Sequence, residues 1–184
     1  MRAALSGPVY PEERAHAPDG VRVSAVLVPL FEEAGETRVV LTRRASTLST
    51  HRSEVSFPGG RVETGEPLVE AALREAWEEV GLDPALVEVI GTLTPLTTYT
   101  SASLVHPFVG VLRGRTELHA NPSEVEVVFD VSLADLLADG VHRSEQWGFD
   151  GADRELHFFE LPGDIVWGET GRMLWELLVK VTSA

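Results

Sequence analysis

Cysteine is absent from this sequence, and basic residues are scarce. Its 184 residues include 15 Lys and Arg against 29 Asp and Glu, which gives a formal net charge of −14. A chain without cysteine cannot be a disulfide-stabilised scaffold, and its composition fits a reducing compartment, so we expect a cytoplasmic protein. The shortage of Lys and Arg argues against general nucleic-acid binding, because no basic surplus is available to contact phosphates. An anionic ligand would need a metal ion or a local group of arginines, because the overall field repels it.

Long apolar segments are absent too. No run approaches the ~18 apolar residues of a membrane span, and the segment MRAALSGPVYPEERAH lacks the apolar core of a signal peptide. We therefore expect no membrane partner. The length suits a single domain covering residues 1–184, in which residues 1–20, rich in Pro and Gly, form an irregular arm or a short helix.

Hydrophobic periodicity predicts a mixture of strands and helices. Apolar or alternating runs between turn residues predict strands over 21–31, 37–44, 87–94, 103–112, 124–133 and 157–161, the first two as a hairpin. Helical spacing predicts a short helix over 133–140 and a C-terminal helix with apolar positions at 173, 174, 177, 178 and 181. The pattern by itself supports the α/β class.

The stretch from Gly59 to Leu82, GGRVETGEPLVEAALREAWEEVGL, carries the clearest chemical signal. Pro67 suits the first turn of a helix, because an N–H has no helical partner there, and Gly81 suits the position after the last turn. Between them, apolar residues recur at helical spacing and predict a buried stripe formed by Val69, Leu73, Ala76 and Val80.

Three carboxylates share a neighbouring face of this helix. Glu78 and Glu79 follow Glu75 at spacings of three and four, and each like-charge pair should cost roughly 0.2–0.5 kcal/mol. A solvated acidic face is one interpretation. Such faces usually interleave Lys or Arg, however, and Arg74 is the only basic residue on this helix. A hard divalent cation bound by carboxylate oxygens, Mg²⁺ or Mn²⁺, would remove the repulsion.

The spacing in this stretch resembles the Nudix box, G-x5-E-x7-R-E-U-x-E-E-x-G-U, in which U is aliphatic. Every fixed position matches, and the matching residues are Gly60, Glu66, Arg74, Glu75, Ala76, Glu78, Glu79, Gly81 and Leu82. The resemblance implies the Nudix fold, an α/β/α sandwich with a mixed β-sheet. It also implies a loop–helix–loop that holds divalent metal against a diphosphate.

The same resemblance suggests roles for the box residues. We expect Glu75 and Glu79 to hold Mg²⁺ or Mn²⁺, with Glu78 and Glu66 as further ligands. Arg74 is expected to orient a box carboxylate, because a buried Glu needs a partner. The expected catalytic set is therefore Arg74, Glu75, Glu78 and Glu79.

Residues around the box complete the expected site. Gly59 and Gly60 would let the backbone approach the substrate closely. Many Nudix enzymes draw a further carboxylate from outside the box, as metal ligand or base. The general base is therefore either a box glutamate or one of two strand residues, Glu124 and Glu126, which an exposed strand face would explain equally well.

Basic residues gather just before this stretch. Arg43, Arg44 and Arg52, together with His51, flank the polar connection that leads to the glycine pair. Ordinary surface charge would account for them. In so acidic a chain, however, a basic cluster beside a metal motif favours contact with substrate phosphate.

This segment also resembles the coenzyme A pyrophosphatase branch of the Nudix hydrolases, which carries L-L-T-x-R-[SA]-x3-R-x3-G-x3-F-P-G-G before the box. The chain has VLTRRA at 40–45 and FPGG at 57–60, at the same distance. Two positions depart from that pattern, since Ser49 replaces its Arg and Ser53 its Gly.

The resemblance implies metal-dependent hydrolysis of the diphosphate of coenzyme A and its derivatives, giving 3′,5′-ADP and 4′-phosphopantetheine or its acyl form. An ADP-ribose or dinucleotide pyrophosphatase is the alternative within the family. A nucleotide-binding module without turnover is a different class, but such modules commonly lose box glutamates, which are all present here. The expected partner is a small nucleotide diphosphate. A homodimer is compatible with the sequence, although no pattern marks a dimer surface.

Overall fold

The computed structural model describes residues 2–13, 20–48, 52–98, 103–149 and 152–183. Eight strands form one mixed sheet: β1 Arg22–Glu33, β2 Glu36–Arg44, β3 Val55–Ser56, β4 Gly59–Arg61, β5 Val87–Thr92, β6 Leu96–Thr97, β7 Ser103–Leu112 and β8 Val125–Ser132. Three more form an antiparallel sheet: β9 His142–Phe149, β10 Ala152–Leu161 and β11 Asp164–Val166. The helices are α1 Arg2–Leu5, α2 Leu68–Val80, α3 Leu133–Leu136 and α4 Gly168–Thr182, with a 3₁₀ turn at Pro84–Leu86.

Strand β1 is the centre of the mixed sheet. It pairs in parallel with β7 on one side and antiparallel with β2 and β4 on the other, while β8 pairs with the far edge of β2. The predicted β1–β2 hairpin is confirmed. It turns at Ala34 and Gly35, which both have positive φ (53° and 84°), as a tight hairpin requires.

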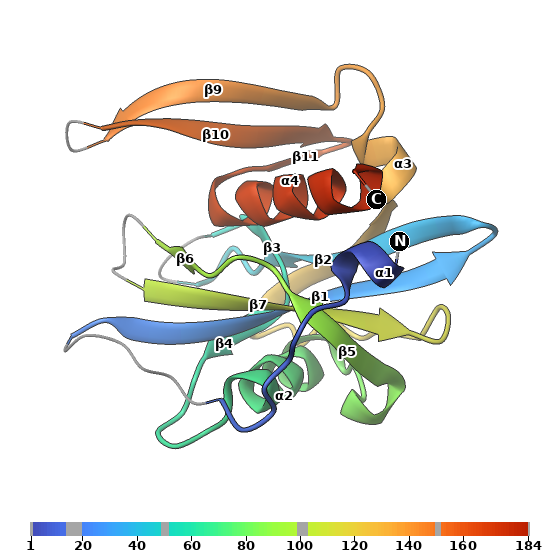
Figure 1. Ribbon diagram of the computed structural model, residues 1–184, viewed down its shortest axis with the longest axis vertical. Coiled ribbons are helices and arrows are strands. Elements are labelled where there is room, and N and C mark those ends of the chain that lie inside the picture. Colours follow the sequence, from blue (N-terminus) through green and yellow to red (C-terminus); the bar gives the residue numbers. More distant parts are fainter. Residues whose placement is uncertain (1, 14–19, 49–51, 99–102, 150–151, 184) are drawn as a thin grey trace.

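The two faces of this sheet are covered by different helices, α2 below and α4 above (Figure 1). Alternate residues of β1 point to opposite faces. Ala25 and Leu27 therefore pack in the core between the sheet and α2, whereas Val28 and Leu30 pack in the core between the sheet and α4. The predicted α/β/α sandwich with a mixed sheet is confirmed.

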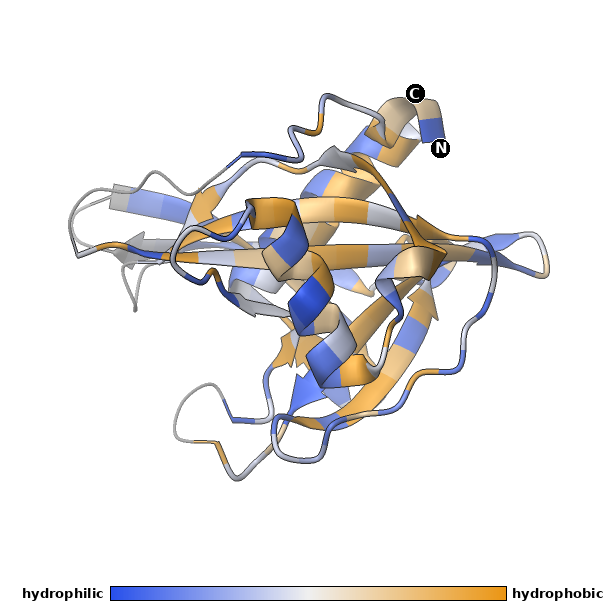
Figure 2. Ribbon diagram, turned by 90° about the horizontal axis from the view of Figure 1, so that it is seen from below, coloured by the Kyte–Doolittle hydropathy of each residue, from blue (hydrophilic) through white to orange (hydrophobic). Residues whose placement is uncertain are grey.

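Helix α2 lies over the sheet with a hydrophilic outer surface, while the strands beneath it are largely apolar (Figure 2). The helix begins at Leu68, so Pro67 is the N-cap residue rather than the first helical residue expected from the sequence. Gly81 ends it as predicted, with φ 68° and its N–H bonded to the carbonyl of Trp77. Val69, Ala76 and Val80 of the expected stripe are buried, whereas Leu73 is only partly buried. Leu68, Ala71 and Ala72 are buried as well.

The second sheet was only partly expected. The sequence predicted a strand over 157–161, but not β9, the first half of β10 or β11. Figure 1 shows the β9–β10 hairpin extending beyond the body of the molecule above α4. Residues such as Arg143, Ser144 and Gln146 are exposed, so an apolar pattern was absent there.

The N-terminal segment contains the short helix α1, which lies against α4 and β5. Arg2 forms an ion pair of 2.7 Å with Glu88 of β5. Residues 14–19 of the expected arm lie outside the described part of the chain. None of the described helices is long and apolar enough to cross a bilayer.

Candidate active site

Glu79 is the most deeply buried carboxylate of the predicted site, with 3% of its surface exposed. The backbone N–H of Gly59 donates to its Oε2 at 3.1 Å, and Nη1 of Arg44 lies 4.0 Å from its Oε1. Burial raises its pKa to about 7. The sequence placed Glu79 on the acidic face. Its position three residues after Ala76, at the edge of the apolar stripe, was the available signal that it faces the sheet.

Glu75 lies one turn earlier, against the other glycine of the pair. A Cβ atom added to Gly60 would come within 2.4 Å of the Glu75 carboxylate, so only glycine leaves room for it. Nη1 of Arg74 donates to Glu75 Oε1 at 2.9 Å. Burial is the main cause that raises the pKa of Glu75, and the charges of Glu78 and Glu124 raise it further.

Arg74 connects the box carboxylates. Its Nε donates to Glu66 Oε1 at 2.8 Å, its Nη1 to Glu78 Oε2 at 3.1 Å, and its Nη2 to the carbonyl of Arg61 at 3.0 Å. The hydrogen bond from Arg74 lowers the pKa of Glu66. Glu66 also accepts the N–H of Glu63 at 2.8 Å. This arrangement agrees with the orienting role expected for Arg74, and it engages both Glu66 oxygens with protein donors.

The carboxylates of Glu75 and Glu79 are oxygen ligands of the kind that a divalent cation prefers. Within the described ranges, no three His, Cys, Asp or Glu side chains are grouped as in a formed metal site. Glu79 nevertheless carries a buried carboxylate whose Oε1 lies beyond hydrogen-bond distance of its nearest guanidinium, and Glu75 is half-buried beside it. A buried carboxylate is costly unless a cation compensates it. The carboxylates of Glu75 and Glu79, which lie against Gly60 and Gly59, therefore fit a hard divalent ion.

The three predicted arginines are in different surroundings. Arg43 is paired within the protein, because its Nη1 lies 3.1 Å from Asp164 of β11 and its Nη2 lies 3.8 Å from Glu126. Arg44 faces Glu79. Arg52 is exposed, and its guanidinium donates to the carbonyl of Leu48. The structure therefore brings one of the three, Arg44, to the box carboxylates.

Two other expectations concern the loop before the box. His51 and Ser49 lie outside the described residues. Ser53 has φ 58°, the left-handed conformation that glycine adopts most easily, at the position where the coenzyme A pattern has glycine. The chain thus keeps at this position the backbone shape for which glycine is suited.

The two candidate carboxylates outside the box also differ. The charge of Glu124 raises the pKa of both Glu75 and Glu79, which shows that its carboxylate is near them. Glu126 is half-exposed and lies near Arg43 instead. The sequence could not separate the two, because they stand two residues apart and therefore share one face of the predicted strand.

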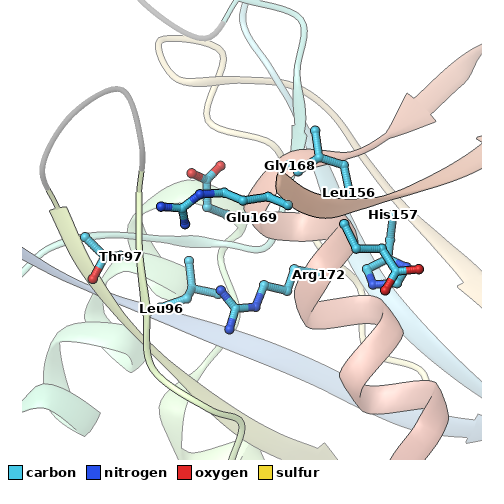
Figure 3. A pocket seen from close by; sticks show the side chains of 9 residues that line it. Leu96, Thr97, Leu156, His157, Gly168, Glu169 and Arg172 are labelled. Carbon is cyan, nitrogen blue, oxygen red and sulfur yellow. The ribbon is translucent and has the colours of Figure 1, made fainter. Parts of the chain in front are cut away.

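The described residues also form a partly open pocket of about 240 Å³, away from the box (Figure 3). Its walls come from β6, β10 and the first turns of α4, with Thr97, Glu169 and Arg172 pointing into it. A larger groove of about 660 Å³ follows the loop from Arg61 to Glu66 and the start of β1. The predicted site residue that lines it is Glu66.

Comparisons with known proteins agree on the family. A model of the NUDIX domain family matches residues 21–149. Nudix hydrolase 22, chloroplastic, of Arabidopsis thaliana is 43% identical over 159 residues, which are 82% of this chain and 52% of that protein. Nudix hydrolase 15, mitochondrial, of the same plant is 42% identical, covering 82% of this chain and 55% of that protein. The chain therefore spans about half the length of these plant relatives.

A bacterial relative and several solved structures extend this result. The uncharacterized Nudix hydrolase NudL of Photorhabdus laumondii is 34% identical over 164 residues, covering 89% of this chain and 87% of that protein. A MutT/nudix family protein from Enterococcus faecalis superposes with a TM-score of 0.66 at 17% identity, covering 93% of this chain and 66% of that chain. The NUDIX domain of Shewanella oneidensis NrtR, solved with ADP ribose, gives a TM-score of 0.53 at 18% identity, covering 65% of this chain and 77% of that chain. These two structural likenesses show the fold. Since the family model covers most of the chain and NudL aligns over most of its own length, the chain belongs to the Nudix hydrolase family.

Proposed function

We propose that the chain is a metal-dependent hydrolase that cleaves the diphosphate of coenzyme A and its derivatives into 3′,5′-ADP and 4′-phosphopantetheine or its acyl form. One observation carries the proposal of hydrolysis: Glu79 is buried at the Gly59 amide, with Arg44 beyond hydrogen-bond distance of its free oxygen. Burying a carboxylate is costly, and Arg44 at 4.0 Å compensates this charge only in part, so a bound cation would complete the compensation.

The residues of the box would divide the work as follows. Glu75 and Glu79, with Glu78, would hold Mg²⁺ or Mn²⁺. The bound ion supplies positive charge against the developing phosphate charge and makes water a nucleophile at neutral pH. Arg74 holds Glu75 and Glu66 in position through its hydrogen bonds. Glu124, whose charge acts on both Glu75 and Glu79, is the better placed of the two strand residues to accept a proton from water.

Coenzyme A is proposed as the substrate because of the segment before the box. The VLTRRA and FPGG segments match the coenzyme A branch, and Ser53 adopts the left-handed backbone that the branch obtains with glycine. The alternative is an ADP-ribose or dinucleotide pyrophosphatase. It is favoured by the fold shared with the NrtR domain that was solved with ADP ribose.

A substrate screen tests the proposal. Purified protein with Mg²⁺ or Mn²⁺ is given coenzyme A, ADP-ribose, NADH and diadenosine polyphosphates, and the products are identified by mass. We expect coenzyme A to have the highest kcat/KM and to yield 3′,5′-ADP. Faster cleavage of ADP-ribose would show that ADP-ribose, rather than coenzyme A, is the substrate. If no diphosphate is cleaved, the protein is not a hydrolase of this kind.

Arg44 and its neighbour Arg43 provide a matched pair of variants that tests whether Arg44 binds substrate phosphate. Arg44→Gln should lower kcat/KM on coenzyme A by about tenfold, because a charge-assisted phosphate contact is worth roughly 1.5–3 kcal/mol. Its effect on Tm should be small. Arg43→Gln should instead lower Tm, because it leaves the mostly buried Asp164 without its partner. A large Tm loss with unchanged kinetics for Arg44→Gln would assign Arg44 a structural role.

A further inference from the structure

The groove of about 660 Å³ lies directly beside the box, between the start of β1 and the loop after β4. Its described lining is formed by residues 20–23 and 61–66. Arg61 follows Gly60, which covers the Glu75 carboxylate, and its own carbonyl accepts a hydrogen bond of 3.0 Å from Arg74. Glu66 is the box glutamate that lines the groove, and the hydrogen bonds of Arg74 connect it to Glu75 and Glu78.

Two arginines stand on one face of the strands at this groove. Arg61 of β4 pairs with Ser24 of β1, and Arg22 precedes Ser24 by two residues, so the side chains of Arg22 and Arg61 project from the same face. Both are exposed. Arg2, Arg43 and Arg74 form ion pairs with carboxylates. Within the ranges that the structure describes, neither Arg22 nor Arg61 forms one.

The charges of the groove favour an anion. Among the described lining residues, Glu66 is paired with Arg74, which leaves Glu63 as the carboxylate without an ion pair, against two guanidinium groups. Like charges at neighbouring positions of paired strands repel each other, and an anion between them would remove that repulsion. The pocket of Figure 3 lacks this bias, because Glu169 and Glu155 line it together with Arg172 and Arg154.

We propose that Arg22 and Arg61 form a phosphate subsite that binds the 3′-phosphate of the substrate's adenosine, while the diphosphate lies at the box carboxylates. The inference rests on the proposed function for the identity of the substrate. A 3′-phosphate carries about two negative charges near neutral pH, and in a chain of net charge −14 it binds only where local cations meet it. The arginine fork suits phosphate oxygens, which it can contact in pairs.

Kinetics on two substrates test the subsite. Arg22→Gln, Arg61→Gln and the double variant are compared on coenzyme A and on 3′-dephospho-coenzyme A. Arg113→Gln, an exposed arginine at the end of β7, is the matched control. We expect each single variant to lose about tenfold in kcat/KM on coenzyme A, mainly through KM, and less than about twofold on the dephospho form. Equal losses on both substrates, or losses no larger than those of Arg113→Gln, would overturn the assignment.

A binding measurement separates this subsite from the proposed reaction. Calorimetry in EDTA compares 3′,5′-ADP with 5′-AMP, which lacks the 3′-phosphate, so no turnover is needed. We expect 3′,5′-ADP to bind about tenfold tighter than 5′-AMP to the wild type and equally to the double variant. If the wild type cleaves no coenzyme A but keeps this preference, the proposed reaction fails and the subsite stands. If the wild type shows no preference, the subsite fails whatever the enzyme cleaves.

Discussion

Helices α2 and α4 cover opposite faces of the same sheet, but their buried sides are built from different residues. The buried side of α4 is large and apolar, and Met173, Leu174, Leu177 and Leu178 are at most 3% exposed. The buried side of α2 is formed mainly by small side chains and includes a carboxylate: Leu68, Val69, Ala71, Ala72, Ala76, Glu79 and Val80. Small residues let α2 approach the strands closely, and β4 meets it with glycine.

This difference shows how one sheet supports both stability and chemistry. A Cβ atom on Gly59 would come within 2.6 Å of the Val26 backbone, and one on Gly60 would collide with Glu75. The close approach places Glu75 and Glu79 against backbone instead of solvent. Because buried carboxylates weaken the fold unless compensated, we infer that the apolar α4 side supplies the stability and the α2 side the site.

The largest effect should come from neutralising the buried carboxylate. Glu79→Gln keeps the shape of the side chain, so we expect kcat to fall by at least about 100-fold with the fold intact, because a proposed metal ligand is lost. Glu169→Gln on α4 is the control and should keep kcat within about twofold. Steady-state kinetics with Mg²⁺ measure both. Near-normal turnover by Glu79→Gln would show that the α2 carboxylate is not part of the chemistry.

Truncating the core of α4 should give the reverse pattern. Leu174→Ala should reduce the free energy of unfolding by roughly 2–5 kcal/mol, because it leaves a cavity at a fully buried position. The kcat of the remaining folded enzyme should change little. Urea unfolding followed by circular dichroism measures the loss, with Leu137→Ala, a half-exposed leucine, as the comparison. A loss below about 1 kcal/mol would contradict the role given to α4.

The α2 side should lose stability as pH rises when no metal is present. The pKa of Glu79 is about 7 in the folded protein and near 4.3 in the unfolded chain. Its contribution is therefore complete below about pH 4 and is lost as pH rises through 7, by up to ~4 kcal/mol. The measurement is the difference in unfolding free energy between wild type and Glu79→Gln in EDTA from pH 5 to 8. A difference independent of pH would contradict the burial of this carboxylate.

The α4 side should respond in the opposite direction and more weakly. His142 and His157 contact each other at 3.1 Å and stack on Trp175 of α4, and burial lowers the pKa of both. The unfolded chain then binds more protons, so stability should fall as pH drops below about 6.5. Comparing wild type with His142→Gln between pH 5 and 7.5 isolates this contribution. If both lose stability equally on acidification, the pair is not the cause.

The sequence was informative where an element is long and one face is apolar. The hairpin of β1 and β2, the strands β5, β7 and β8, and helix α2 all follow from periodicity. Strands β3, β4, β6 and β11 contain two or three residues, too few to show a period. Strand β9 is mostly polar, so no apolar alternation marks it.

The site was predictable to a similar degree. The box spacing predicted Glu75, Glu79 and the glycine pair as one group, because local sequence fixes which residues share a helix face, and the structure places these residues together. The partner of Arg43 was not predictable, since Asp164 lies 121 residues away and meets it only through the packing of β11 beside β3. The proximity of Arg22 and Arg61 was not predictable for the same reason, because only strand pairing brings them to one face.

Removing divalent metal tests whether the buried carboxylates of α2 hold a catalytic cation. Protein dialysed against EDTA is assayed on coenzyme A, then titrated with Mg²⁺ or Mn²⁺, with the products followed by mass. We predict no 3′,5′-ADP in EDTA, full recovery on adding either ion, and no recovery for Glu79→Gln. Undiminished cleavage in EDTA would contradict the claim that buried carboxylates on α2 hold a catalytic divalent cation.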